Sequence, residues 1–369
     1  MRVSPAGKRQ GGGSDPRDLR DPRDLRDLRL VELSALCTEE LGLPPFRARQ
    51  IFSWIHARGV TSTLPMTNLS KDLRQRVAAL GSLAPLELET ELSSEDGTRK
   101  LRLRCRDGAA LETVLIPGER ADAGERGAAG KLTQCLSSQI GCGLGCRFCA
   151  TGSMGLSRNL RPGEIVDQVY RARALQGDRI TNLLFMGMGE PMNNLSSVLA
   201  AVEILCCDLG QNFSPRRITI STAGVVPGIE ELGRLAPELG LAVSLNATTD
   251  EVRSQLMPVN RRWPLGELMA ALRRYPLPRR RRITFEYVLI AGVNDRPADA
   301  RQLPRLLDGL RCKVNLIACN PAPGTSYGRP EEAAVEDFAE RLRDKGLPTY
   351  LRQSRGSSIA AACGQLVTS

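Results

Sequence analysis

Apolar residues in the first third of the chain follow two different spacings. Between residues 30 and 85 they recur every three to four positions, which predicts three helices separated by Gly and Pro breaks, at 30–41, 46–58 and 70–80. Residues 86–117 instead form short alternating runs, which predict a hairpin around residues 95–97 and a further strand after it. We therefore expect a small N-terminal helical accessory domain, residues 30–95, followed by a β segment and a flexible loop, residues 96–130.

From about residue 131 onward, short apolar runs alternate with amphipathic segments of helical length. The runs predict strands at 132–137, 181–187, 217–222, 240–246, 282–290, 312–318 and 348–352. The segments between them predict helices at 162–175, 194–206, 228–235, 264–275, 298–309 and 331–345. This alternation is typical of βαβ units and a parallel sheet, so residues 131–369 predict an α/β domain. The number of repeats suits either a barrel or a doubly wound sheet.

Polar and sulfur-containing residues follow these predicted strands at their carboxyl ends. Three cysteines come after the first strand, a Gly-rich turn after the second, Ser221 at the end of the third and Ser244 at the end of the fourth. Asn320 follows the sixth strand, and Cys363 lies beyond the last. Because both candidate folds collect function at the carboxyl ends of their strands, we expect one binding site there.

The composition predicts a polyanionic partner and argues against a membrane protein. The formal net charge of +10 favours nucleic acid as a partner. No run of 18 apolar residues and no apolar leader segment occur, so we expect a cytoplasmic protein with no membrane partner. Residues 1–29 contain Gly11–Gly13 and repeats of Asp-Pro-Arg-Asp-Leu-Arg, a composition that predicts a disordered tail.

Cys142, Cys146 and Cys149 form a C-x3-C-x2-C pattern, which indicates a metal site. A structural zinc site needs four ligands, and His56, the chain's only histidine, lies in the N-terminal helical region. A distant cysteine could complete such a site. The alternative is a [4Fe–4S] cluster in which three irons bind thiolates and the fourth iron is open to a small chelating molecule.

The wider sequence around these cysteines resembles the RlmN/Cfr family of radical S-adenosylmethionine (SAM) RNA adenine methyltransferases. The resemblance covers residues 30–369 and rests on several motifs in the expected order: PFRARQIFSWIHARG, CLSSQIGCGLGCRFCATGSMGLSRNL, LLFMGMGEPMNNL, RRITISTAGVVPGIEELG, LAVSLNATTDEVRSQLMPVN, CKVNLIACNPAPGTSYGRP and RGSSIAAACGQL. The GMGEP turn, with proline, is more similar to the C2-methylating RlmN branch than to the C8-methylating Cfr branch. The resemblance implies a partial (βα)6 barrel over residues 131–369.

By resemblance, Cys142, Cys146 and Cys149 hold one [4Fe–4S] cluster whose fourth iron binds SAM. The matching positions for the rest of the SAM site are Gly189, Glu190, Ser221, Ser244, Leu245, Asn246 and Asn320. The family usually has histidine where Asn246 stands, so we expect altered contacts at this position.

The resemblance also implies a reaction that uses two SAM molecules per turnover. Cys363 takes a methyl group from the first, and a radical generated from the second converts that group into a methylene radical that adds to adenine C2. Glu112, by the same matching, accepts the C2 proton, and Cys135 releases the RNA by forming a transient disulfide with Cys363. The loop between Glu112 and Cys135 is longer than the family pattern leads us to expect.

The family's targets are an adenine in 23S rRNA near the peptidyl-transferase centre and the tRNA adenine 3′ of the anticodon. The resemblance implies an electron donor such as flavodoxin or ferredoxin, and we expect a monomer that grips RNA with its N-terminal domain. Three alternatives remain: a C8-methylating relative, a paralogue with another substrate, and a non-catalytic RNA-binding protein with a structural zinc.

Overall fold

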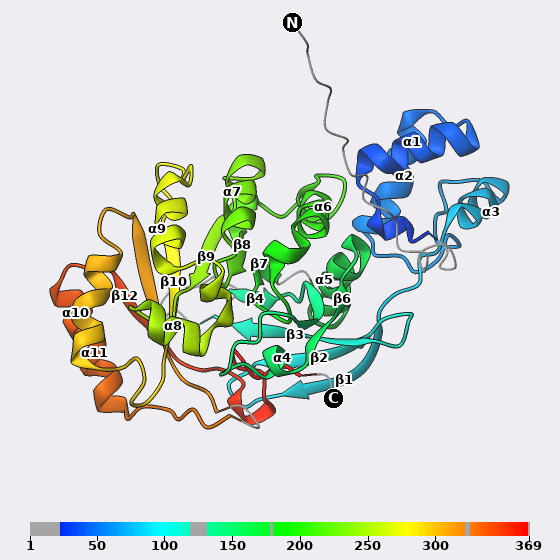
Figure 1. The fold of residues 1–369 in the computed structure, drawn as a ribbon. Helices are drawn as coiled ribbons and strands as arrows, with labels where there is room; N and C mark the ends of the chain where they lie inside the picture. The colour runs from blue at the N-terminus through cyan, green and yellow to red at the C-terminus, as the bar shows by residue number, and fades with distance from the viewer. Residues whose placement is uncertain (1–22, 119–130, 178–179, 322–324, 368–369) are drawn as a thin grey trace, which may run out of the picture.

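The strands of this computed structural model form one ten-stranded sheet and one two-stranded sheet (Figure 1). The structure describes residues 23–118, 131–177, 180–321 and 325–367. Seven strands of the large sheet are parallel, and each lies beside the next one in sequence. A doubly wound sheet would reverse its strand order at one point, so this order identifies a barrel.

The parallel strands and the helices between them form six βα repeats and a seventh strand. The strands are β4 (Leu132–Cys135), β7 (Ile180–Phe185), β8 (Ile218–Thr222), β9 (Gly240–Ser244), β10 (Ile283–Leu289), β11 (Cys312–Ala318) and β12 (Thr349–Arg352). The covering helices are α5 (Pro162–Gln176), α6 (Leu195–Cys206), α7 (Val226–Leu235), α9 (Leu265–Arg274), α10 (Pro297–Leu306) and α11 (Glu332–Asp344). The predicted partial (βα)6 barrel is confirmed.

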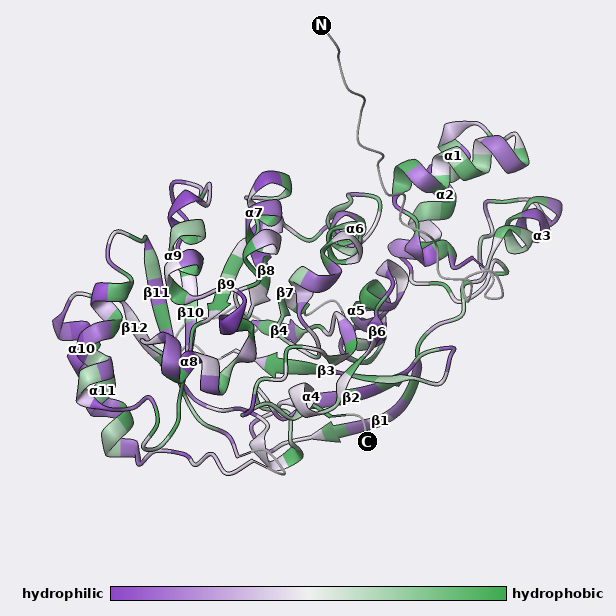
Figure 2. Cartoon of the chain, viewed as in Figure 1, coloured by the Kyte–Doolittle hydropathy of each residue, from purple (hydrophilic) through white to green (hydrophobic). Residues whose placement is uncertain are grey.

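Each barrel strand has one face under the helices and one face toward the interior of the barrel. In β10, Phe285, Tyr287 and Leu289 are buried while the residues between them are partly open. Figure 2 shows β8 and β9 as largely hydrophobic and the surrounding helices with hydrophilic turns on the outside. This period of two places Glu286 on the interior face, among the groups of the candidate site.

The three strands before the barrel extend its sheet instead of forming a separate connection. The predicted hairpin is confirmed: β1 (Glu87–Ser93) pairs antiparallel with β2 (Arg99–Arg104). The next strand, β3 (Ala110–Pro117), pairs antiparallel with both β2 and β4. The expected domain limit at residue 95 therefore cuts through the sheet, because β1 already belongs to it. Residues 119–130, most of the expected flexible loop, lie outside the described residues.

The N-terminal domain consists of α1 (Leu30–Leu41), α2 (Pro45–His56) and α3 (Lys71–Leu80), as predicted. Its described part begins earlier than expected, which corrects the predicted tail of residues 1–29. Residues 25–27 form the short 3-10 helix η2 (Leu25–Asp27), and the fully buried Leu25 packs in the core. Leu25 supplies the apolar burial that the charged repeat around it lacks. Residues 1–22 lie outside the described residues.

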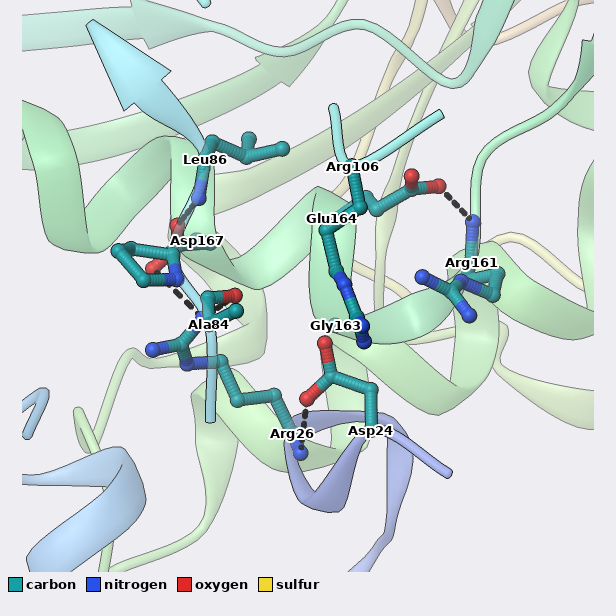
Figure 3. Close-up of a pocket in the computed structure, with 10 residues that line it drawn as sticks. Asp24, Arg26, Ala84, Leu86, Arg106, Arg161, Gly163, Glu164 and Asp167 are labelled. Atoms are coloured by element: carbon teal, nitrogen blue, oxygen red, sulfur yellow. Dashed lines mark hydrogen bonds and ion pairs between the residues drawn. The ribbon is translucent and has the colours of Figure 1, made fainter. Parts of the chain in front are cut away.

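A buried charge network fixes the N-terminal segment against α5 of the barrel (Figure 3). The Arg26 guanidinium, 1 % exposed, donates to the carbonyl oxygens of Leu83 and Ala84. It also lies 3.8 Å from the Asp167 carboxylate, which accepts a 2.6 Å hydrogen bond from the Leu86 N–H. The two terminal nitrogens of this buried guanidinium are used, and their contacts join the start of the chain, the linker before β1 and α5.

Among the described helices, none has the combination of length and apolar character that crossing a bilayer requires.

Candidate active site

The three clustered cysteines lie on one compact turn after β4. Cys142 ends β5 (Gln139–Cys142), which pairs with β6 (Gly155–Asn159), and Cys149 caps the one-turn helix α4 (Ala150–Ser153). The turn depends on Gly141, whose φ is +74° and whose added Cβ would lie 2.0 Å from the Gly155 carbonyl oxygen. A side chain at that position would force β5 and β6 apart.

The thiols of this turn are close enough to influence one another electrostatically. Burial raises the pKa of Cys142 to about 11, with smaller contributions from Glu190 and Cys149. Burial also raises the pKa of Cys146, which is raised further by the Cys149 and Cys142 thiols. Several cationic irons would reverse this unfavourable balance, because a bound metal deprotonates a coordinating thiol. The residues therefore fit a multi-iron centre.

A single-ion site is not formed by the same residues. Among the described residues, no group of three or more His, Cys, Asp or Glu side chains converges as one metal ion requires. His56 is fully buried on α2 of the N-terminal domain, and its Nδ1 lies 2.8 Å from the Tyr170 hydroxyl. Thiolates that bind different irons of a cluster need not converge on one point.

The Gly-rich turn after β7 packs directly on β5. Gly189 has φ +95°, and an added Cβ would lie 2.5 Å from the Gln139 Cβ, so only glycine fits. Glu190 follows, 3 % exposed, and its two carboxylate oxygens accept from the N–H groups of Ala223 (2.8 Å) and Met192 (3.1 Å). Burial raises the pKa of Glu190 to about 7 despite these bonds. A carboxylate in this position suits a cationic ligand group such as an ammonium.

The ends of β8 and β9 bring Ser221 and Ser244 to the same edge of the barrel. Ser221 pairs in register with Ala242, two residues before Ser244. Leu245 is fully buried, and its N–H donates to the Glu286 carbonyl oxygen over 2.9 Å. Asn320, 8 % exposed, lies just after the end of β11.

Asn246 has a structural role that the sequence did not predict. It adopts φ +57°, a conformation that asparagine tolerates better than most residues. Its Oδ1 accepts from the Val288 N–H (2.8 Å), its Nδ2 contacts the Met257 sulfur (3.3 Å), and its carbonyl oxygen accepts from Asn294 (2.7 Å). The residue is 1 % exposed, so Asn246 is packed within the strand ends that line the site.

A buried arginine that sequence reasoning missed holds these strand ends together. Arg253, on the unpredicted helix α8 (Asp250–Leu256), is fully buried. Its guanidinium donates to the carbonyl oxygens of Ala223 (2.6 Å), Leu245 (3.0 Å) and Ser244 (3.2 Å). Burial lowers the pKa of Arg253 to about 10. In the sequence EVRSQL this arginine looks like a solvated helix residue, so no local signal could have identified it.

The segment that carries Cys363 is hydrogen-bonded to two other parts of the site, the cysteine turn and the residues after β11. In Figure 1 this red segment runs beneath the barrel to end beside β1 and α4. Gly364 O accepts from the Ala150 N–H (2.7 Å) and Leu366 O from the Thr151 hydroxyl (2.6 Å), which ties the segment to the cysteine turn. Gln365 donates to the Pro321 carbonyl oxygen after β11 (3.1 Å). The position of Cys363 beside the cysteine turn is therefore fixed by main-chain contacts.

Cys363 and Cys135 face the same interior space but differ in exposure. Cys135 is 6 % exposed on β4, whereas Cys363 is exposed to solvent, and both thiols are free. Burial first, then the carboxylate of Glu286, raises the pKa of Cys363 to about 11, because protein surrounds the open space on most sides. Burial and the Cys363 thiol raise the pKa of Cys135, and Arg352 on β12 opposes the increase for both thiols.

Glu112 lies on β3, next to the strand that carries Cys135. The register pairs Val114 with Cys135, so Glu112, two residues earlier, shares its face of the sheet. Glu112 is 3 % exposed and bonds to both Lys100 and the Val367 N–H. The structure thus brings Glu112, Cys135 and Cys363 to one side of the barrel interior, next to the cysteine turn.

Two family models match the chain. The Radical SAM superfamily model covers residues 136–303, and the Ribosomal RNA large subunit methyltransferase N-terminal domain model covers residues 23–82. A protein of Anaeromyxobacter dehalogenans called dual-specificity RNA methyltransferase RlmN is 49 % identical, over 88 % of this chain and 87 % of its own. The chain belongs to the RlmN family. It is therefore a radical SAM RNA methyltransferase, and it uses SAM and a [4Fe–4S] cluster.

Further relatives agree with membership of the RlmN family. The RlmN protein of Sorangium cellulosum is 48 % identical, over 92 % of this chain and 94 % of its own. A crystal structure of a radical SAM methyltransferase from Sphaerobacter thermophilus is 46 % identical and superposes with a TM-score of 0.85, covering 94 % of this chain and 99 % of the other. The RlmN resemblance drawn from the motifs is thus confirmed.

Proposed function

We propose that this protein methylates C2 of adenine, in 23S rRNA at the peptidyl-transferase centre and in tRNA at the adenine 3′ of the anticodon, with Cys363 as the methyl carrier. The relatives' name, dual-specificity RNA methyltransferase, supports the two RNA classes. The observation that carries the proposal is the position of Cys363. Its thiol is open to the barrel interior while main-chain bonds hold it beside the cysteine turn.

The proposed cofactor site uses the residues on the turns and strand ends. Cys142, Cys146 and Cys149 each bind one iron of a [4Fe–4S] cluster, and SAM lies against Gly189, Glu190, Ser221, Ser244, Leu245, Asn246 and Asn320. When bound, the cofactors supply a methyl group from one SAM and a carbon-centred radical from a second. Glu190 accepts a hydrogen bond from the SAM ammonium, since its buried carboxylate favours a cation.

The proposed chemistry of the protein's own residues needs one carrier, one base and one resolving thiol. Cys363 carries the methyl group and then joins the protein to adenine C2 through a methylene. The radical adduct must lose one electron, which the iron–sulfur cluster would take back. Glu112 then takes the C2 proton while the bonding electrons of the C2–H bond stay in the ring. The Cys135 thiolate then attacks the Cys363 sulfur. An S–S bond forms, the S–C bond breaks, and the carbon takes up a proton to become the product methyl group.

We propose that the N-terminal domain binds the RNA. Phe46 on α2 is 53 % exposed, and the Arg47 guanidinium lies 4.9 Å from its ring centroid. Arg58 lies 3.9 Å from the ring centroid of Trp54 on the same helix. Aromatic rings with adjacent guanidinium groups are suited to unstacked bases and phosphates. We further propose a cytoplasmic monomer that receives electrons from a flavodoxin or ferredoxin.

The direct test is nucleoside mass spectrometry of rRNA and tRNA from cells with and without this gene. We expect 2-methyladenosine in both RNA classes only when the gene is present. Digestion and comparison with authentic standards locate the methyl group on C2 or C8. Methylation at C8, or unchanged levels of 2-methyladenosine after gene removal, would overturn the proposal.

A further inference from the structure

We propose that Lys100 is a positioning residue that holds the Glu112 carboxylate against the Cys363 segment, so that base and methyl carrier act on the same carbon. The proposal rests on the function proposed above, because it assigns a partner to the proposed base. Neither the motifs nor the family matching point to Lys100. It lies in RKLRLR, a basic run that looks like a solvated strand face.

The Lys100 ammonium joins two separate parts of the chain. Its Nζ lies 3.0 Å from Glu112 Oε1 on β3 and donates to the Ala360 carbonyl oxygen over 3.1 Å. The two side chains are 8 % and 5 % exposed, so water does little to screen the pair. Lys100 therefore connects the proposed base to a residue three positions before Cys363.

Glu112 holds the same segment on the other side of Cys363. Its second oxygen, Oε2, accepts from the Val367 N–H over 3.0 Å, four residues after Cys363. The carboxylate is thus fixed by Lys100 at one oxygen and by the segment itself at the other. Each carboxylate oxygen has two lone pairs, so each keeps one to accept a proton.

A purely structural role explains this pair less well. Replacing a buried ion pair by apolar side chains of similar volume is often neutral or stabilising, so burial of two opposite charges is weak evidence for a stabilising function. What the pair does provide is orientation. Lys100 on β2 orients the Glu112 carboxylate on β3 toward the interior. Because Lys100 also contacts Ala360, this orientation is coupled to the position of Cys363.

The step that depends on this orientation is removal of the C2 proton. In the covalent adduct the C2–H bond breaks, its electron pair stays in the ring, and its proton moves to a Glu112 oxygen. Lys100→Met removes the donor that fixes Oε1, so the carboxylate points toward C2 less often. Methylation of Cys363 and attachment of RNA, which precede proton removal, need neither Lys100 nor Glu112.

The test follows RNA transcribed with adenosine deuterated at C2, using the full-length holoenzyme. We expect Lys100→Met to carry methylated Cys363 by peptide mass spectrometry and to accumulate a covalent protein–RNA adduct that retains deuterium, and we expect the same of Glu112→Gln. Release of RNA should slow by about 10- to 100-fold, the range typical when a group that orients a functional side chain is removed. Lys100→Arg, which keeps the charge, should release RNA faster than Lys100→Met.

Arg99→Met is the matched control. It makes the same kind of change one residue earlier on β2, where Arg99 pairs with Glu91 at the surface, and should turn over like the wild type. The Lys100→Met, Glu112→Gln double variant should release RNA no more slowly than Glu112→Gln alone, since the two residues act through one carboxylate.

Three outcomes would overturn the assignment. These are wild-type release by Lys100→Met, a trapped adduct that has lost its deuterium, and loss of Cys363 methylation in Lys100→Met, Lys100→Gln and Lys100→Arg alike. The last would make Lys100 a residue of the fold only. Failure of the proposed function looks different, since the wild type itself would then form no methylated RNA and Cys135→Ala no covalent adduct.

Discussion

At the scale of single residues, the difference in exposure between Cys135 and Cys363 agrees with the reaction partners proposed for each thiol. Cys363 is exposed, as its proposed reactions with a cofactor and an RNA base require. Cys135 is buried on β4 and needs to reach only the Cys363 sulfur. Burial raises the pKa of both thiols, which disfavours the thiolate form of each.

Replacing Cys135 should separate attachment from release. Cys135→Ala keeps every group proposed to join the protein to RNA but lacks the thiol that frees it. We expect a slow-migrating band that survives denaturation and disappears after ribonuclease treatment. The double variant Cys135→Ala, Cys363→Ala should form no such band. Normal turnover by Cys135→Ala would remove Cys135 from the mechanism.

Replacing any cysteine of the turn should remove the iron–sulfur centre. Cys142→Ala, Cys146→Ala and Cys149→Ala each delete one proposed iron ligand, so we expect loss of visible iron–sulfur absorption after anaerobic reconstitution and no cleavage of SAM. Cys206→Ala and Cys207→Ala, at the end of α6, are matched controls that should keep the absorption. An intact spectrum in any turn variant would contradict the ligand assignment.

At the scale of elements, helix α8 connects several parts of the site. Arg253 bonds three carbonyl oxygens at the ends of β8 and β9, and its fourth partner is Asn260 Oδ1 at 3.0 Å. The carbonyl oxygen of Leu256, the last residue of α8, accepts from the Arg147 N–H of the cysteine turn (2.9 Å). One short helix therefore positions the strand ends and the turn together.

Arg253→Met should both destabilise the fold and weaken SAM binding. The substitution leaves several buried carbonyl oxygens without donors, at about 1–3 kcal/mol each. We expect the free energy of unfolding to fall by about 3 kcal/mol or more, measured by urea denaturation. Arg261→Met, an exposed arginine on η5 (Pro258–Arg261), should change it by less than about 0.5 kcal/mol. A change of less than about 0.5 kcal/mol for Arg253→Met would show that the Arg253 hydrogen bonds are not needed for the stability of the fold.

The elements that the sequence predicted are those with a regular apolar period. The seven barrel strands and five of the six covering helices have both ends within two residues of the expected ones, and α10 ends at Leu306, three residues before its expected end at 309. No regular apolar period marks α8, which has few apolar residues, or the β5–β6 hairpin, in which glycines interrupt the alternation typical of strands. In the site, motifs identify residues that act locally. Lys100 and Arg253 act through partners distant in sequence, and composition gives no sign of those contacts.

At the scale of the whole molecule, the junction between the N-terminal domain and the barrel is charged. Asp27 accepts from the Gly163 N–H at the start of α5 (2.7 Å), close to Asp24, Glu164 and Arg161. Burial first, then Asp24, raises the pKa of Asp27 from 3.8 to about 7, and the Gly163 bond and Arg161 oppose the increase only in part. The junction thus holds a carboxyl group that prefers its proton.

This raised pKa predicts the direction in which stability depends on pH. The folded protein keeps the Asp27 proton up to about pH 7, whereas the unfolded chain releases it near pH 4, so this contribution is present below pH 4 and lost as pH rises to about 7. Asp27→Asn does not titrate. Its free energy of unfolding relative to the wild type should therefore increase between pH 4 and pH 7, measured by urea denaturation. The exposed Asp308→Asn should show no such trend, and a flat difference for Asp27→Asn would contradict the assignment.

The contacts of the Cys363 segment join the most distant described parts of the chain. Ser358 bonds Ser94 across 264 positions in sequence, Gly356 bonds Asp96 across 260, and Val367 bonds Glu112 across 255. Contacts of such separation close large loops and form slowly, after local helices and neighbouring strands have paired. During folding, the barrel can therefore assemble before Cys363 reaches its interior. Under the proposed mechanism, a chain at that stage could not attach itself to RNA, and the covalent chemistry would begin only when folding is complete.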